Sequence, residues 1–297
     1  MRADTLAHLD PAVKDALNLP TQERVTRILT EKWVGYTVAS SLLMRLEQLL
    51  IQPKSRRSNL LLIAAPGNGK TTIIDQFKKN NPWQSPANAE PFVPVLSFDM
   101  PPDPSEGRFW NAVLRAMAVS FREGDNPAKK ESLALDCLRA LRVRMLIIDE
   151  FHNSLHGNPK QTRQFLATLK NLINALSIPI VAAGTKEAVI ALNSDSQMTS
   201  RFDVTTLPKW ELNSEFLRLL VSLERFIPLA EPSELKSQKI ATEIFRQSSG
   251  TIGGITDLLQ RSACLAVQRG EERITFSHLE EARRNSADSF TDQLRHV

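Results

Sequence analysis

Residues 64–71 read Ala-Ala-Pro-Gly-Asn-Gly-Lys-Thr and join a glycine-rich turn to a lysine and a hydroxyl side chain. A phosphate-binding loop needs this combination, because backbone N–H groups at the start of a helix must converge on an anion. We expect Lys70 to place a positive charge at the β- and γ-phosphates and Thr71 to offer a hydroxyl to Mg²⁺. The predicted nucleotide-binding residues of this loop are Pro66, Gly67, Asn68, Gly69, Lys70, Thr71 and Thr72.

The loop departs from the usual G-x-x-x-x-G-K-[ST] pattern at one position, since Ala64 stands where the first glycine is expected. Alanine adopts strand-like dihedrals readily, so we expect the loop to form without that glycine. Asn68 tolerates left-handed backbone better than most residues, which suits a tight turn. For this motif alone, the alternative is a glycine-rich turn followed by a chance Lys-Thr pair.

Two adjacent acids, Asp149 and Glu150, end a second apolar run, 79 positions after Lys70. We expect Asp149 to hold Mg²⁺ through water and Glu150 to orient and deprotonate an attacking water. A solvated acidic pair at the end of a strand is the alternative. Taken together, the loop and the acidic strand end predict a site that binds ATP with Mg²⁺ and hydrolyses it.

Two further polar residues are candidates for the same chemistry. Thr185 ends the apolar run 178–185, where its hydroxyl would sense the γ-phosphate; the alternative is a helix N-cap. Arg201 follows a predicted short helix, and an arginine so placed in ring- or filament-forming ATPases stabilises the transition-state charge in the neighbouring subunit. An ordinary surface arginine or an intramolecular ion pair is the alternative for Arg201.

Short apolar runs that alternate with helical patterns must position these residues. The runs are typical of buried strands and span residues 60–64, 92–100, 143–150 and 178–185. Helices are predicted over Thr71–Lys79 and Phe109–Phe121, and a long amphipathic helix contains Phe165 and Leu176. This alternation predicts an α/β fold with a parallel sheet flanked by helices.

The predicted division of the chain has three parts. A loosely ordered arm covers residues 1–21, an α/β nucleotide-binding domain covers 22–211, and a small all-helical lid covers 212–297. The net charge of +4 and the pI of about 9.1 permit nucleic-acid binding without requiring it.

The two cysteines, Cys137 and Cys264, belong to no metal-binding pattern, which favours a reduced protein without a structural metal. The N-terminus lacks the apolar region of a signal peptide. No apolar run reaches the ~20 residues that span a bilayer. We therefore expect a cytoplasmic protein with no membrane partner.

In this order, the phosphate loop, the D-E strand, the polar strand tip, the S-R-F sequence and the helical C-terminal part resemble the AAA+ ATPases. More closely, the chain resembles the bacterial TniB family of transposition ATPases, which are related to TnsC. The similarity covers about residues 22–285, and the segment around His152 and Asn153 is one of its specific parts. The sequences concerned are EKWVGYTVASSLLMRLEQLL, NLLLIAAPGNGKTTII, LIIDEFHNSL, RQFLATLKNLINALSIPIVAAGTKEAV and SRFDVTTLPKW.

The resemblance implies a bacterial ATP-dependent transposition regulator, associated with the nucleoid when bound to DNA. Such proteins assemble on double-stranded DNA as homo-oligomers, in rings or helical filaments, and recruit a DDE transposase of the TniA or TnsB kind. A TniQ-like targeting protein is often involved. By this resemblance Thr185 is the sensor and Arg201 the finger that acts on a neighbouring subunit. A replication-type AAA+ loader or initiator, and a nucleotide-gated scaffold with little hydrolysis, are the alternatives.

Contacts with DNA are predicted at Arg108, Lys160 and Arg163, which follow strand ends. The sequence shows no base-reading motif, so we expect contacts to the phosphate backbone without sequence specificity. A solvated charged face is the alternative for each residue.

Trp33 and Tyr36 precede the strand before the phosphate loop, where AAA+ proteins hold adenine, so we expect them to contact the base. Packing of this turn against the lid is the alternative. In the lid, Gly253-Gly254-Ile255 lies where many AAA+ proteins have a sensor arginine, and the nearest arginine, Arg261, is two helical turns further on. Because the lid departs from the AAA+ pattern here, we expect slow, regulatory hydrolysis.

Overall fold

The chain divides into two compact units. The α/β unit is Thr37–Pro208, and the helical unit combines Met1–Tyr36 with Lys209–Val297. The computed structural model describes residues 6–30, 32–52, 59–84 and 91–284. Parts of the predicted arm and lid, residues 1–5 and 285–297, lie outside the described residues.

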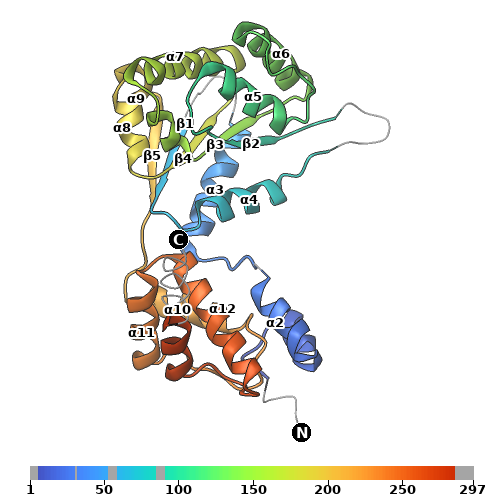
Figure 1. Cartoon of the computed structure of the whole chain (residues 1–297), viewed down its shortest axis with the longest axis vertical. Helices are drawn as coiled ribbons and strands as arrows, with labels where there is room; N and C mark the ends of the chain where they lie inside the picture. The colour runs from blue at the N-terminus through green and yellow to red at the C-terminus, as the bar shows by residue number, and fades with distance from the viewer. Residues whose placement is uncertain (1–5, 31, 53–58, 85–90, 285–297) are drawn as a thin grey trace, which may run out of the picture. The chain divides into compact units, whose positions relative to one another are not determined.

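Five parallel strands form the sheet of the α/β unit, in the order β2-β3-β4-β1-β5 (Figure 1). All five residues of both β3 and β4 are buried, because helices cover both faces of the sheet. The carboxyl ends of parallel strands meet at one edge, so the ends of β1, β3 and β4 lie together there. The strands are β1 (Asn59–Ala64), β2 (Val95–Asp99), β3 (Met145–Asp149), β4 (Ile180–Gly184) and β5 (Phe202–Leu207).

The sequence predicted four of these strands, and the parallel sheet flanked by helices is confirmed. The strand that was missed, β5, lies at the edge of the sheet and pairs with β1 alone. Its sequence, Phe-Asp-Val-Thr-Thr-Leu, buries only the two end residues. An edge strand of this kind lacks the continuous apolar run that marks a buried parallel strand.

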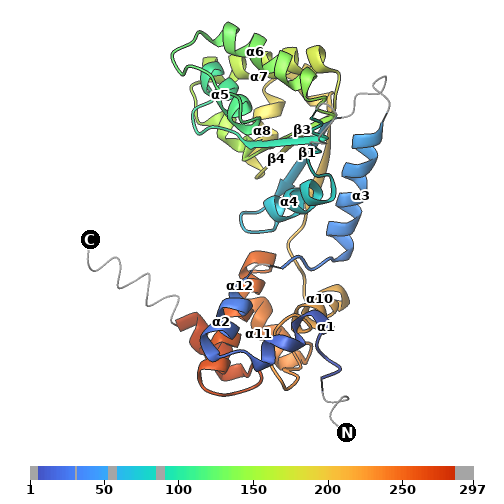
Figure 2. The same ribbon diagram turned by 90° about the vertical axis from the view of Figure 1, so that its right-hand side faces the viewer.

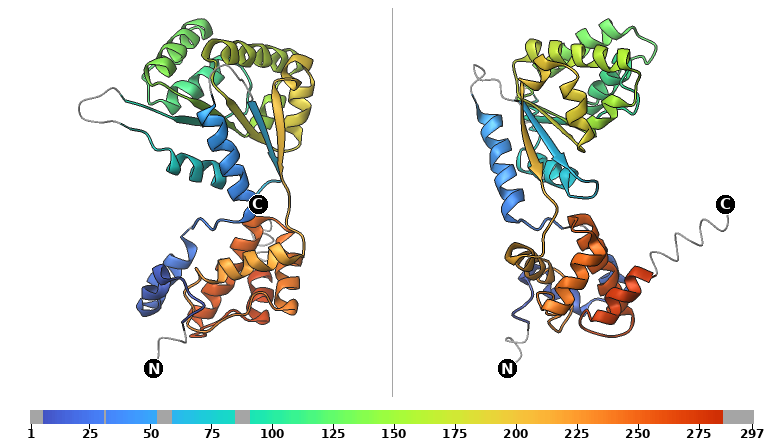
Figure 3. Two further views of the ribbon diagram at one scale, coloured as in Figure 1. Left: turned by 180° about the vertical axis from the view of Figure 1, so that it is seen from behind. Right: turned by 90° about the vertical axis from the view of Figure 1, so that its left-hand side faces the viewer.

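Helices α5, α6, α7 and α8 cover one face of the sheet, and α3 and α4 cover the other (Figures 1 and 2). Figure 3 shows the same arrangement from two further sides, with α3 in blue across the sheet from the green and yellow helices. The helices of this unit are α3 (Thr37–Ile51), α4 (Lys70–Asn80), α5 (Glu106–Ala116), α6 (Pro127–Ala140), α7 (Pro159–Leu176), α8 (Glu187–Asn193) and α9 (Ser196–Thr199), with the 3-10 helix η2 (Phe151–Leu155).

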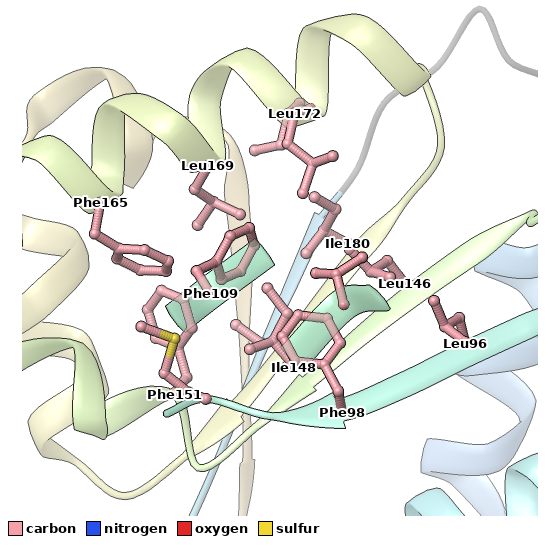
Figure 4. Packing of buried hydrophobic residues seen from close by; sticks show 14 of the residues in the cluster. Leu96, Phe98, Phe109, Leu146, Ile148, Phe151, Phe165, Leu169, Leu172 and Ile180 are labelled. Carbon is pink, nitrogen blue, oxygen red and sulfur yellow. The ribbon is translucent and has the colours of Figure 1, made fainter. Parts of the chain in front are cut away.

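Aromatic side chains from three elements meet above the sheet and anchor the helices α5 and α7 (Figure 4). The ring centroid of Phe109 on α5 lies 5.3 Å from that of Phe165 on α7, in an edge-to-face arrangement. Phe151, directly after the acidic pair, packs 5.9 Å from Phe165. The burial of Phe151 in this cluster fixes the segment that follows Glu150.

The helical unit brings the start of the chain together with its end. Arg24 on α2 donates from both terminal nitrogens to Glu272 and from Nε to the carbonyl of Pro228 at 2.8 Å. Ile28 is buried in the hydrophobic cluster of the C-terminal helices. The elements are α1 (Pro11–Lys14), η1 (Asp15–Asn18), α2 (Thr21–Leu29), α10 (Ser214–Glu224), α11 (Gln238–Ser248) and α12 (Ile252–Gln268).

This division differs from the predicted boundaries, which put an arm at 1–21 and began the α/β domain at residue 22. Leu9, Val13 and Ala16 are buried, so the described part of the predicted arm is packed. The apolar side chains were too few and too widely spaced for the sequence to indicate that packing. Among the helices of the described residues, none is long and apolar enough to cross a membrane.

Candidate nucleotide-binding site

The loop between β1 and α4 turns at two glycines. Gly67 has a φ of +67° and Gly69 a φ of +85°, in the left-handed region that residues with a Cβ rarely adopt. A Cβ added to Gly67 would meet no atom within 4 Å. At Gly67 the backbone conformation, and not a lack of space, therefore requires glycine. Pro66, the residue before it, is exposed on the same turn.

The two unusual loop residues are both explained by the end of β5. Ala64 is the last residue of β1, where it pairs with Leu207, and its φ is not positive, so alanine fits in place of glycine. The expectation that Asn68 occupies a left-handed backbone position is wrong, because its φ is not positive. Instead, its buried side-chain amide donates to the carbonyls of Leu207 at 3.0 Å and Pro208 at 2.9 Å. Asn68 thus ties the loop to the end of the neighbouring strand.

Helix α4 begins at Lys70, directly after the loop. The N–H groups of Lys70, Thr71 and Thr72 belong to the first helical turn and have no acceptor within the helix. The helix dipole adds partial positive charge at the same point. Lys70 is buried, and among the described residues none forms an ion pair with it. A helix start with a buried, unpaired lysine favours an anionic ligand.

The hydroxyl and the first acid are in direct contact. Thr71 Oγ1 donates to Asp149 Oδ2 at 2.7 Å, and the backbone N–H of Glu150 donates to Asp149 Oδ1 at 2.8 Å. A hydroxyl and a carboxylate are oxygen ligands of the kind that Mg²⁺ prefers. Within the described residues, no group of three or more His, Cys, Asp or Glu side chains could hold a metal alone. The pair therefore fits a Mg²⁺ that arrives with nucleotide phosphates.

A third acid, which the sequence analysis missed, lies beside Asp149. Asp99 ends β2 and is the register partner of Asp149 on β3. Burial, followed by the negative charge of Asp149, raises the pKa of Asp99 above its ordinary value. The acid at the end of 92–100 was visible in the sequence, but its contact with Asp149 depends on β2 being the neighbour of β3.

Glu150 has a left-handed φ of +52° and begins the η2 segment. Its carboxylate lies 3.3 Å from Nε2 of His152. The side chain of Glu150 is 42% exposed, whereas Asp149 is buried. The two acids therefore differ in environment: Asp149 faces Thr71, and Glu150 faces an imidazole and solvent.

Thr185 directly follows β4, which lies between β3 and β1 in the sheet. Its hydroxyl donates to the carboxylate of Glu187, and this bond is the main reason that the pKa of Glu187 is below its ordinary value. The carbonyl of Thr185 accepts from the N–H of Ala188 at 2.9 Å. The structure thus places Thr185 at the carboxyl edge with the loop and the acids, although its hydroxyl makes no N-cap bond to α8.

Arg201 lies at the opposite edge of the sheet. It precedes β5, and its carbonyl accepts from the backbone and side-chain nitrogens of Asn59, the first residue of β1, at 3.3 and 3.0 Å. Its guanidinium donates to Asn174 Oδ1 at 3.0 Å. The length of β1, about 17 Å, separates this edge from the phosphate loop. The fold therefore places Arg201 and Lys70 of the same chain at opposite edges of the sheet.

The three predicted DNA-contacting residues lie on two neighbouring elements. Arg108, near the start of α5, is 63% exposed and lies 3.4 Å from Asp103. Lys160 and Arg163 are exposed in the first turns of α7. The loops before these helices touch, because a Cβ added to Gly157 would lie 2.7 Å from Pro104 Cγ. Both loops follow carboxyl ends of strands.

The predicted adenine contacts lie in the helical unit. The ring of Tyr36 lies 5.0 Å from that of Trp210, edge to face, and packs against the helical cluster. Burial raises the pKa of Tyr36 to about 12. Tyr36 therefore makes the lid contact that was the alternative for it. Trp33 is half-buried in the same unit.

At the start of α12, Gly254 lies close to the backbone of the preceding turn. A Cβ on Gly254 would lie 2.6 Å from the carbonyl oxygen of Ser248. Arg261, further along the helix, is held by Asp257, with Nε 2.9 Å from Oδ1. The close approach at Gly254 explains why a larger residue does not occupy this position.

The sequence profile of the family described as bacterial TniB protein matches residues 24–212, more than half of the chain. The chain belongs to the TniB family. The match includes every candidate residue of the α/β unit, among them Lys70, Thr71, Asp149, Glu150, Thr185 and Arg201. No curated protein sequence matches the chain.

Solved structures show that this TniB protein has the AAA+ fold. It resembles Cdc6p from Pyrobaculum aerophilum, with a TM-score of 0.63 and 18% identity over 86% of this chain and 69% of that one. The Aeropyrum pernix ORC1 protein in complex with DNA gives 0.61 and 15% identity over 92% and 72%. The Thermotoga maritima RuvB Holliday junction branch migration motor gives 0.51 and 15% over 87% and 72%. At these identities the likeness shows the fold alone.

Proposed function

We propose that this TniB-family protein is an ATP-dependent regulator of DNA transposition. It binds ATP with Mg²⁺, assembles as a homo-oligomer on double-stranded DNA, and recruits or activates a DDE transposase of the TniA or TnsB kind at the target, together with a TniQ-like targeting protein. The observation that supports the nucleotide site best is the contact between Thr71 and Asp149 beside the buried Lys70. Membership of the TniB family supports transposition as the process.

The residues of the site divide the chemistry among them. Lys70 and the N–H groups of the loop bind the phosphates, and Thr71 with Asp149 would hold Mg²⁺, which neutralises phosphate charge when it is bound. Glu150 orients the attacking water and accepts its proton. The hydroxyl of Thr185, which now donates to Glu187, would instead meet the γ-phosphate.

The position of Arg201 supports the proposal of a homo-oligomer. Arg201 lies too far from the phosphate loop of its own chain to contact a nucleotide bound there. In an oligomer, the Arg201 of one copy can instead contact the nucleotide bound by the adjacent copy. ATP bound between two copies would then stabilise the oligomer, in a ring or a helical filament.

DNA binding is proposed at Arg108, Lys160 and Arg163. The ion pair of Arg108 with Asp103 is solvent-exposed, and Lys160 and Arg163 are exposed, so the cationic groups are available to phosphates. Contacts of this kind bind without reading sequence and weaken as salt rises. Adenine contact by Trp33 and Tyr36 is part of the same proposal, although the packing of Tyr36 leaves Trp33 the better candidate.

The test is binding to a fluorescent DNA duplex at fixed salt, with ATP, a non-hydrolysable analogue, ADP or no nucleotide. We expect cooperative binding with the two triphosphates only, and its loss in Lys70→Ala. Lys79→Ala is the matched control, because Lys79 is exposed at the other end of the same helix. Binding that is indifferent to nucleotide, or equal in Lys70→Ala, would contradict the proposal.

A further inference from the structure

The η2 segment after Glu150 is tied to the ends of two strands, one on either side of β3. On one side, Asn153 Nδ2 donates to the carbonyl of Met100, directly after β2, at 2.9 Å. On the other side, η2 packs against β4. A Cβ added to Gly184 would lie 3.2 Å from the backbone nitrogen of His152 and 3.6 Å from its Nδ1. His152 and Asn153 therefore fix the position of Glu150 from both sides.

The imidazole of His152 lies between Glu150 and the β4 tip. Its Nε2 is 3.3 Å from Glu150 Oε2, while its Nδ1 is buried and has no hydrogen-bond partner among the described residues. The charged or titratable groups that face it are Glu150, the neighbouring imidazole of His156 and, beyond the β4 tip, Glu187. The pKa of Glu187 is lowered chiefly by the Thr185 hydroxyl, then by its own backbone, with smaller contributions from Lys186 and His152.

This arrangement restrains the group on which hydrolysis depends. A carboxylate that contacts a packed imidazole at 3.3 Å is held in one place by that contact. Glu150 has left-handed backbone in addition, so its conformation depends on the packing of η2. To act on a water at the γ-phosphate, the carboxylate must leave the imidazole.

We infer that His152 is a positioning residue that holds the Glu150 carboxylate back and so slows the hydrolysis of bound ATP. This inference rests on the proposed function, since it concerns the same site. His152 also connects Glu150 to Thr185, because Gly184 lets η2 lie directly against the β4 tip. A shift of Thr185 toward a γ-phosphate would therefore displace the imidazole and release Glu150.

The experiment measures kcat and KM for ATP hydrolysis by the full chain. His152→Ala and His152→Phe both remove the imidazole nitrogen that lies 3.3 Å from Glu150. The phenyl ring fills the space beside the β4 tip, in case the smaller alanine impairs folding. We expect kcat to rise about twofold to fivefold with KM unchanged, because the 3.3 Å contact between the Glu150 carboxylate and the imidazole no longer has to break. His152→Gln restores an N–H donor and is expected to return kcat toward the wild-type value.

Two controls separate restraint of Glu150 from a general change in packing. His156→Ala removes the neighbouring imidazole, whose ring centroid lies 6.2 Å from that of His152, and is expected to leave kcat unchanged. In a Glu150→Gln background, His152→Phe is expected to give no increase, because the carboxylate to be released is absent.

A kcat that is unchanged or lower in both His152→Ala and His152→Phe overturns the inference while the proposed function stands, provided that the wild type hydrolyses ATP and Lys70→Ala does not. An increase that persists in the Glu150→Gln background also overturns it. Equal activity of wild type and Lys70→Ala overturns the proposed function and the inference with it.

Discussion

The contact between Thr71 and Asp149 makes a prediction that can be worked out from the structure. Valine has the shape of threonine without the hydroxyl, so Thr71→Val removes the 2.7 Å bond to a buried carboxylate. Asp149 keeps the N–H of Glu150 at 2.8 Å. Because Thr71 is exposed and water can replace its hydroxyl, the loss should be near the lower end for a bond to a charged group, about 1.5 kcal/mol. For a domain of the size of the α/β unit, that lowers the unfolding midpoint by about 3–6 °C.

The same variant tests the magnesium site. Saturating ligand stabilises a folded protein by about 2.7 kcal/mol at a hundred times its Kd. We expect Mg²⁺ and ATP to raise the unfolding midpoint of the wild type and to raise that of Thr71→Val much less. Adding a chelator should remove most of this difference between the two proteins.

Thermal unfolding with and without nucleotide, Mg²⁺ and chelator is the assay, and Thr71→Ser is the matched control because it keeps the hydroxyl. We expect the serine variant to behave as the wild type does. Two results together would refute the reasoning: a valine variant as stable as the wild type without nucleotide, and the same Mg²⁺-dependent gain in both.

Three further predictions concern other parts of the chain. Arg201→Ala and Lys70→Ala are each expected to be inactive in ATP hydrolysis. A mixture of the two should regain activity, because the Lys70→Ala copy presents an intact Arg201 to the intact phosphate loop of its neighbour. A mixture as inactive as its components would count against a trans-acting arginine. Gly69→Ala should cost about 1–2 kcal/mol of stability in urea unfolding, since its φ of +85° strains any residue with a Cβ, and an unchanged midpoint would contradict this. The Arg24 side chain holds the pKa of Glu272 below its ordinary value, so the stability from this pair is present at neutral pH and is lost as pH falls through the lowered pKa. In urea unfolding at several pH values, the deficit of Glu272→Gln should shrink in acid, and a deficit independent of pH would contradict the pairing.

The α/β core could be predicted because its signals are local. The runs that became β1 and β3 are buried on both faces, so they are continuously apolar, and the loop before Lys70 has its glycines where left-handed backbone is needed. Parallel strands then bring Asp149 and Thr71 to one edge without further information. These parts of the site could therefore be predicted from the order of strands and helices along the sequence.

The remainder depends on contacts between distant segments. The pairing of Asp99 with Asp149 can be predicted only when the order of the strands in the sheet is known. The packing of His152 against Gly184 depends on how closely η2 approaches the end of β4. Helix α6 was also missed, because its described side chains are mostly exposed and only a few, such as Leu138, reach the core. The burial of Arg24 against Glu272 joins residues from the two ends of the chain, which no local pattern indicates.

The most direct test of the central claim measures the mass of the complexes that the full chain forms on a short DNA duplex. With ATP or its non-hydrolysable analogue, we predict particles that contain several copies of the chain on each duplex. With ADP, or with Lys70→Ala under any condition, only free chain and free duplex should be found. The same masses with every nucleotide and in both proteins would contradict ATP-gated assembly on DNA.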